Sequence, residues 1–190
     1  MKRFQYNSPV VLTYFFISLA VLISGILTGG FTTRLLFSVY RTSFSDLFAY
    51  LRVFGHVLGH ADMSHFLSNM LLLLVVGPPL EEKYGSKVLL TGIVLTALIS
   101  GILQLILFPQ AALLGASGIV FMMIMLSSLS GMENGRIPLT LILVAILYLG
   151  REIHSMLFVE DSVANFMHIV GGACGTVFGF SLAKRKISRK

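Results

Sequence analysis

Residues 9–29 read PVVLTYFFISLAVLISGILTG, a run without a charged side chain. About 20 consecutive apolar residues are enough for an α-helix to cross the hydrocarbon core of a bilayer. The apolar region of a secretory signal peptide is shorter, so we expect this stretch to be retained as a membrane-crossing helix. Lys2 and Arg3 precede it.

The rest of the chain has the same character. Of its 190 residues, 56% are hydrophobic and 12% are charged, whereas about a quarter of an average soluble domain is charged. Further apolar segments lie at 62–80, 87–107, 115–131, 137–150 and 162–183. The sequence therefore predicts an all-α membrane protein with six transmembrane helices in a single domain, 1–190.

The connection between the first two segments, residues 30–61, is long and of mixed composition. It contains FSDLFAYLRVFGHVL at 44–58, which has an amphipathic pattern. Amphipathic segments of membrane proteins tend to lie in the interface between lipid and water. We expect this connection to rest on the membrane surface.

The basic residues indicate the orientation of the helices. The net charge is +6, but five of the fourteen Lys and Arg residues lie in the tail KRKISRK at 184–190, so a nucleic-acid partner is not expected. Six crossings place ten Lys and Arg residues on the side of both termini and four on the other side. Cytoplasmic loops are enriched in Lys and Arg, so 1–8 and 184–190 are predicted to be cytoplasmic and 30–61 external. The tail and the lack of a targeting segment favour a bacterial inner membrane.

Polar residues of three predicted helices lie at one depth. Ser117 lies near the start of the fourth segment, His168 lies about six residues into the sixth, and His65 and Asn69 occupy the first turns of the second. With a rise of about 1.5 Å per residue, all four fall within about the outer third of the bilayer. Polar residues at such a depth are costly and usually face a wet cavity or the bundle interior.

These four residues match the needs of a serine hydrolase. A serine hydroxyl requires a base to accept its proton, and a histidine is the usual partner. The resulting oxyanion needs hydrogen-bond donors, which the Ser117 amide, His65 and Asn69 can supply. No acidic residue lies near His168 within a segment, so a Ser–His dyad is predicted.

Simpler interpretations stay open for each part. GASG at 115–118 is also typical of close helix packing, as are Gly171, Gly175 and Gly179 at four-residue spacing. His65 and Asn69 can serve as interhelical hydrogen-bonding residues. His56, His60 and His65 do not have the HExxH spacing of a zinc site, so no metal or other cofactor is expected.

With these residues the chain resembles the rhomboid family of intramembrane serine proteases over about residues 50–182. GASG at 115–118 matches the nucleophile motif, HIVGG at 168–172 matches the sixth-helix motif, and HADMSHFLSN at 60–69 matches the second-helix motif. GPPLEEKYG at 77–85 matches a structural motif, and Leu51-Arg52 resembles the first-loop motif.

The resemblance implies a six-helix rhomboid bundle with Ser117 and His168 as catalytic dyad and His65 and Asn69 in the oxyanion hole. The residues it implies as supporting are His60, Gly115, Gly118, Phe121, Gly171, Gly172 and Gly175. Two positions depart from the family pattern. Phe121 replaces a tyrosine that packs on the catalytic histidine, and Leu51 replaces a tryptophan.

The function implied is cofactor-independent cleavage of transmembrane segments of membrane proteins, in a cavity open to the external side. The loop 151–161 would cap the cavity and 137–150 would act as its gate. A catalytically silent rhomboid-like binder of membrane proteins is the alternative. A channel or transporter is disfavoured, because its polar residues would line both halves of the membrane.

Overall fold

The structure is a computed structural model that describes residues 5–131, 136–150, 154 and 162–187. Its described elements are helices, accompanied by an antiparallel bridge between Val39 and Leu113. The helices are α1 (Pro9–Leu27), α2 (Phe31–Leu36), α3 (Leu47–Gly55), the 3₁₀ turn η1 (His56–Leu58), α4 (Met63–Tyr84), α5 (Ser86–Leu107), α6 (Ser117–Leu129), α7 (Leu139–Val144), the π-helical η2 (Ala145–Leu149) and α9 (Ser162–Ile187).

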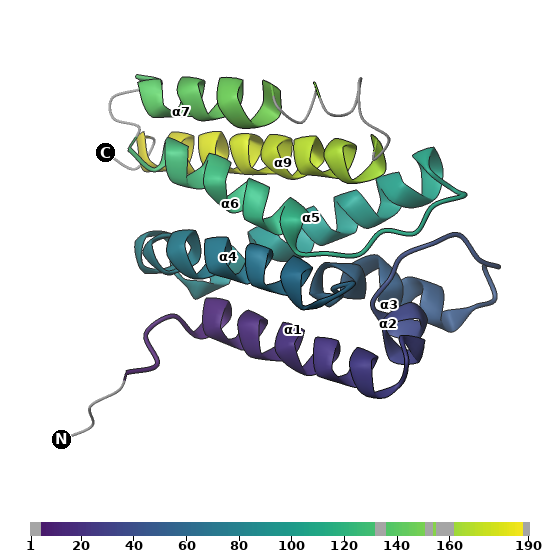
Figure 1. The fold of residues 1–190 in the computed structure, drawn as a ribbon. Helices are drawn as coiled ribbons and strands as arrows, with labels where there is room; N and C mark the ends of the chain where they lie inside the picture. Colours follow the sequence, from purple (N-terminus) through teal and green to yellow (C-terminus); the bar gives the residue numbers. More distant parts are fainter. Residues whose placement is uncertain (1–4, 132–135, 151–153, 155–161, 188–190) are drawn as a thin grey trace.

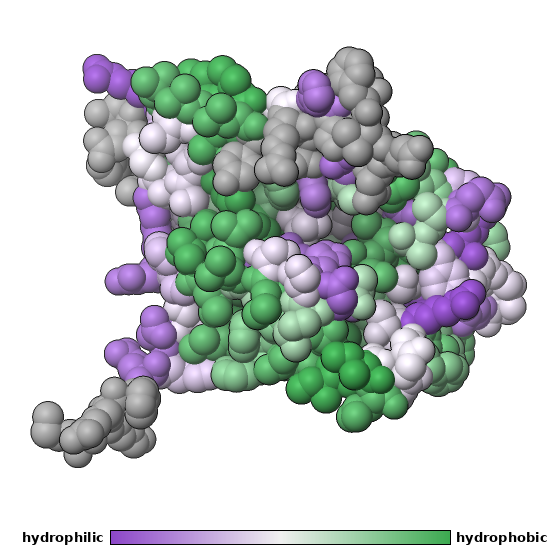
Figure 2. Space-filling model, viewed as in Figure 1, coloured by the Kyte–Doolittle hydropathy of each residue, from purple (hydrophilic) through white to green (hydrophobic). Residues whose placement is uncertain are grey.

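The predicted all-α class is confirmed. The helices α1, α4, α5 and α9 are long and apolar enough to cross a membrane. The predicted fourth and fifth segments form shorter helices, with 13 residues in α6 and 6 in α7, so six crossings stay a prediction. Figure 2 shows the apolar residues in a broad band and the hydrophilic residues gathered mainly toward the two ends of the bundle.

The long helices run side by side, and α6 lies between α4 and α9 (Figure 1). The beginning of α1 and the end of α9 lie at the same end of the bundle. Buried residues occur all round α6, as expected for a helix surrounded by others. They are Ile119, Val120, Met122, Met123, Met125, Leu126 and Leu129.

Glycines bring α9 into backbone contact with α6. A Cβ atom added to Gly171 would lie 2.1 Å from the carbonyl oxygen of Gly118, and one added to Gly175 would lie 2.2 Å from that of Met122. Neither position has room for a side chain. The four-residue glycine spacing of the sixth segment therefore serves helix packing, which fixes the distance between these two helices.

Glu81 joins the beginning of α1 to the turn between α4 and α5. Its buried carboxylate accepts hydrogen bonds from the amides of Val10 (2.9 Å) and Val11 (3.0 Å) and from the hydroxyl of Ser86 (2.7 Å). The first amides of a helix have no acceptor within the helix, so Glu81 satisfies two of those in α1. The helix α4 continues to Tyr84, through Pro78 and Pro79 and beyond its predicted end.

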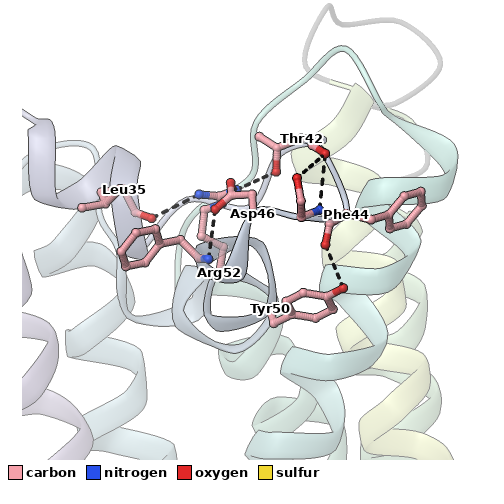
Figure 3. Close-up of polar contacts among 9 residues, drawn as sticks. Leu35, Thr42, Phe44, Asp46, Tyr50 and Arg52 are labelled. Atoms are coloured by element: carbon pink, nitrogen blue, oxygen red, sulfur yellow. Dashed lines mark hydrogen bonds and ion pairs between the residues drawn. The ribbon is translucent and has the colours of Figure 1, made fainter.

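The connection 30–61 is largely helical, because α2, α3 and η1 all lie within it. The amphipathic stretch at 44–58 contains α3 and η1. Arg52 of α3 is buried and holds the preceding loop by contacts with Asp46 (2.5 Å), the Thr42 hydroxyl (2.8 Å) and the Leu35 carbonyl (3.3 Å), as Figure 3 shows. Leu51, beside it in sequence, is 57% exposed.

Candidate active site

Ser117 is the first residue of α6, and the loop that leads to it is tied to the connection 30–61. Val39 and Leu113 exchange two backbone hydrogen bonds of 2.9 Å, and the amide of Gly115 donates to the carbonyl of His56 over 2.9 Å. The loop runs back from the end of α5, so α6 begins well inside the length of the bundle (Figure 1). The Ser117 side chain is thereby recessed and half-buried.

The imidazole of His65 and the hydroxyl of Ser117 both lie near Gly115. A Cβ atom at position 115 would lie 2.9 Å from Nε2 of His65 and 3.9 Å from Oγ of Ser117. The φ angle of Gly115 is +131°, a value that other residues rarely adopt. A glycine at this position thus keeps a small space open between the predicted nucleophile and one predicted oxyanion donor.

His168 lies on α9 across the glycine contact from the beginning of α6. The position of a Cβ on Gly118 is 3.6 Å from the Met167 carbonyl oxygen, and Gly171 touches Gly118 directly. Ser117 adjoins Gly118, while His168 lies between Met167 and Gly171. The structure therefore brings the serine and histidine turns against each other, and a hydrogen bond between their side chains stays a prediction.

Phe121 covers the imidazole of His168. The two rings are stacked, with centroids 4.6 Å apart and an angle of 10° between their planes. Phe121 follows Ser117 by about one helical turn, so it holds the histidine ring on the same side of α6. The phenylalanine at this position stacks as expected, although it lacks a hydroxyl group.

Asn69 and Asp62 fix the first turns of α4. The Asn69 side chain is buried and donates to the His65 carbonyl over 3.0 Å. Asp62 caps the helix by accepting the His65 amide over 2.8 Å. Asp62 was not among the predicted site residues, although an aspartate just before a helix is a recognisable capping signal.

His60 supports His65 from the other side. Its buried ring meets the ring of His65 edge-on at a centroid distance of 5.1 Å, and that of Phe66 at 5.4 Å. Burial lowers the pKa of His60 to about 4, so the ring is neutral near pH 7.

Of the other predicted supporting residues, Gly172 is buried in α9, where its carbonyl accepts a hydrogen bond from the Thr176 hydroxyl over 2.9 Å.

His56 and Ser100 form a second polar contact next to the site, and this contact was not predicted from the sequence. Nε2 of His56 lies 3.2 Å from the Ser100 hydroxyl, and both residues are buried. Burial lowers the pKa of His56 to about 4. Ser100 and Gln104 are polar residues four positions apart in an otherwise apolar segment. This spacing could have indicated that their helix forms a buried polar contact.

Among the described residues, no group of three His, Cys, Asp or Glu side chains is arranged to hold a metal ion. The predicted cap, 151–161, lies outside the described residues except for His154, which is exposed. The predicted gate, 137–150, contains α7 and η2.

The comparison with protein families matches the Rhomboid domain to residues 48–185. The chain belongs to the rhomboid family. This rhomboid chain has apolar helices long enough to cross a bilayer, so it is an integral membrane protein.

Two relatives are similar to parts of this rhomboid chain. Rhomboid-related protein 1 of Caenorhabditis elegans is 34% identical over 132 residues, which cover 64% of this chain and 36% of the relative. Rhomboid-like protease 3 of Toxoplasma gondii is 34% identical over 86 residues, covering 45% of this chain and 32% of the relative. The chain thus spans about a third of the length of these curated relatives.

Proposed function

We propose that this rhomboid chain is an intramembrane serine endopeptidase that cleaves transmembrane segments of membrane proteins. The observation that carries this proposal is the meeting of three helices at the beginning of α6. There the Ser117 hydroxyl and the ring of His65 both lie near Gly115, and His168 lies across the glycine contact with its ring stacked on Phe121. One serine, two histidines and a helix N-terminus gathered at one place are well suited to acyl transfer.

In the first half of the reaction, Oγ of Ser117 attacks the scissile carbonyl carbon while His168 accepts the hydroxyl proton. The carbonyl oxygen becomes an oxyanion, which the Ser117 amide and the side chains of His65 and Asn69 hold by hydrogen bonds. The amides of the first turn of α6 have no acceptor within the helix, and the helix dipole favours negative charge there. His168 then returns the proton to the leaving amine.

In the second half, His168 takes a proton from water, and the resulting hydroxide attacks the acyl-enzyme ester. The second tetrahedral intermediate collapses and releases the carboxyl product, while His168 returns its proton to Oγ and restores the Ser117 hydroxyl. This step needs water at the site, so the cavity has to open to one face of the membrane. We place that opening at the external side, with both termini cytoplasmic, because six crossings put ten of the fourteen Lys and Arg residues on the side of the termini.

The substrate class follows from the state of peptide bonds in a bilayer. The backbone of a transmembrane helix is fully hydrogen-bonded within the helix, so a peptide bond has to be unwound before it can be attacked. We therefore expect substrates with small or helix-breaking residues near the cleaved bond.

The segment 137–150 is proposed as the gate through which substrates enter, and the segment 151–161 as the cap over the cavity. A location in the bacterial inner membrane stays a prediction.

The proposal is tested by reconstituting the full chain in liposomes with a labelled single-span substrate. Ser117→Ala and His168→Ala should each reduce cleavage by at least about a thousandfold, since removing either member disables the dyad. Ser128→Ala is the matched control on the same helix, because the Ser128 hydroxyl donates to the Ile124 carbonyl of its own helix over 3.0 Å. It should leave cleavage unchanged.

Equal cleavage by wild type and both dyad variants would overturn the assignment. A fluorophosphonate probe gives a second readout that needs no substrate. It should label wild type and Ser128→Ala but not Ser117→Ala. A wild-type chain that binds membrane proteins but neither cleaves them nor takes up the probe would be a catalytically silent rhomboid-like binder.

A further inference from the structure

A groove of about 650 Å³ separates the loop before α3 from the flank of α5. Its walls include Phe44, Tyr50 and Phe54 on one side and Ile102 and Ile106 on the other. These side chains are strongly exposed, and Phe44 is 90% exposed. In an integral membrane protein, such an apolar groove on the flank of a long helix is filled by lipid chains rather than by water.

Arg41 lies on the lining of this groove and is exposed. The nearby carboxylate, Asp46, is already paired with the buried Arg52, which also binds the Thr42 hydroxyl (Figure 3). Within the described part of the chain, Arg41 forms no ion pair. The groove therefore combines apolar walls with an uncompensated positive charge.

The loop that carries Arg41 is held in a defined shape. Arg52 fixes it from inside the fold, and the Tyr50 hydroxyl donates to the Phe44 carbonyl over 3.1 Å (Figure 3). This hydrogen bond joins two residues of the groove wall. The wall is thus formed by the fold itself and does not depend on an occupant.

We propose that this groove binds a phospholipid with a negatively charged headgroup. Its phosphate would pair with the Arg41 guanidinium, which matches phosphate oxygens in a bidentate manner. One acyl chain would lie along Phe54 and Ile102. The charge of Arg52 is neutralised by Asp46, so Arg41 supplies the positive charge on the groove lining, which favours an acidic over a zwitterionic headgroup.

The lipid would also stabilise the connection that supports the site. The groove wall belongs to the segment that ends in η1, and the carbonyl of His56 in η1 accepts the amide of Gly115. A ligand that binds only the folded state stabilises that state by mass action. Acidic phospholipid should therefore raise the thermal stability of the chain independently of any proteolytic activity.

Native mass spectrometry of the full chain in a neutral detergent tests this site. The chain is titrated with phosphatidylglycerol and, separately, with phosphatidylcholine of the same acyl chains. Wild type should bind phosphatidylglycerol more tightly, and Arg41→Gln should weaken this binding about five- to tenfold. Arg34→Gln is the matched control, an equal loss of charge on the same connection but outside the groove, and it should have little effect.

A second pair of variants tests the apolar part of the groove. Ile102→Trp fills it and should weaken the binding of phosphatidylglycerol, whereas Ile99→Trp, on an exposed part of α5 outside the lining, should not. Arg41→Lys keeps the charge and should retain the preference for phosphatidylglycerol. Equal binding of both lipids to wild type, or equal losses in Arg41→Gln and Arg34→Gln, would overturn the proposal.

Discussion

Gly115 shows how a single residue shapes the candidate site. Its positive φ and its contact with the ring of His65 both exclude a side chain at this position. Alanine there would bring a methyl group within 2.9 Å of Nε2, so either the imidazole or the loop would have to move. The first glycine of the GASG motif is therefore required by the backbone conformation and by the nearby ring of His65, and its neighbours in sequence do not reveal this requirement.

Phe121 has a more specific role, because it stacks on the ring of the predicted base. Phe121→Ala removes this contact, and we expect kcat/KM to fall about tenfold, since an aromatic stack contributes on the order of 1 kcal/mol. Phe121→Tyr keeps the stack and should cleave at about the wild-type rate. Cleavage of a fluorogenic transmembrane substrate measures both variants.

The same stack can be checked without catalysis. The imidazole proton signals of His168 should shift in the NMR spectrum of Phe121→Ala, because the ring current of the phenyl group is lost. Unchanged cleavage by Phe121→Ala would contradict a role in positioning the base.

The pairing of α6 with α9 is the element-scale feature on which the site depends. The serine is carried by one helix and the histidine by the other, and the glycines of α9 allow backbone contact between them. A shift of about 1 Å at this interface would move the hydroxyl and the imidazole apart, and positioning errors of that size cost catalysis about a hundredfold.

Gly175→Val tests the contact between these helices. Its side chain would meet the carbonyl of Met122, which a Cβ atom would already approach within 2.2 Å. We expect destabilisation by about 1–3 kcal/mol from overpacking and a parallel loss of cleavage. Ala173→Val is the matched control on the exposed face of the same helix and should change neither.

Thermal unfolding in detergent, followed by circular dichroism, measures the stability of both variants. If Gly175→Val and Ala173→Val unfolded at the same midpoint temperature, the two helices would have room to separate without a loss of stability.

At the scale of the whole molecule, buried histidines link the connection 30–61 to the bundle. His56 contacts Ser100 of α5, and His60 contacts the ring of His65 in α4. Both histidines lie outside the four long apolar helices, and burial lowers the pKa of each to about 4. The connection therefore packs against the bundle with these two imidazoles neutral.

This predicts a pH-dependent stability. The unfolded chain, with histidine pKa values near 6.5, binds more protons than the folded chain between about pH 6.5 and 4. The contribution is fully present above about pH 6.5, and the free energy of unfolding should decrease by up to about 1.4 kcal/mol per pH unit for each histidine as the pH falls through this window. Asp46, whose pKa is lowered mainly by its bond to Arg52, should lose its contribution only at lower pH.

Thermal unfolding from pH 7.5 to pH 4 checks this prediction. His56→Gln should have a shallower pH dependence than wild type, whatever its absolute stability. A midpoint that stays constant from pH 6.5 to pH 4 would mean that these histidines are not buried as neutral groups.

The sequence by itself determined the all-α class and the membrane character, because apolar runs of helical length are a local property of the chain. It also indicated Ser117, His168, His65 and Asn69, since a polar residue in such a run needs a reason. The resemblance to the family marked GPPLEEKYG at 77–85, which contains Glu81, as a structural motif, although it did not reveal the contacts of Glu81 with the amides of α1.

Only the tertiary structure decided where the short α6 begins, how close His65 comes to Gly115, and that His56 meets Ser100. Each of these depends on residues far apart in the chain, such as Gly115 and His56, whose backbones are hydrogen-bonded. Apolar patterns specify that a segment is a helix, but they carry no distance between two helices. That distance is set by the packing of backbone on backbone at Gly118 and Gly171, which exists only after the bundle has formed.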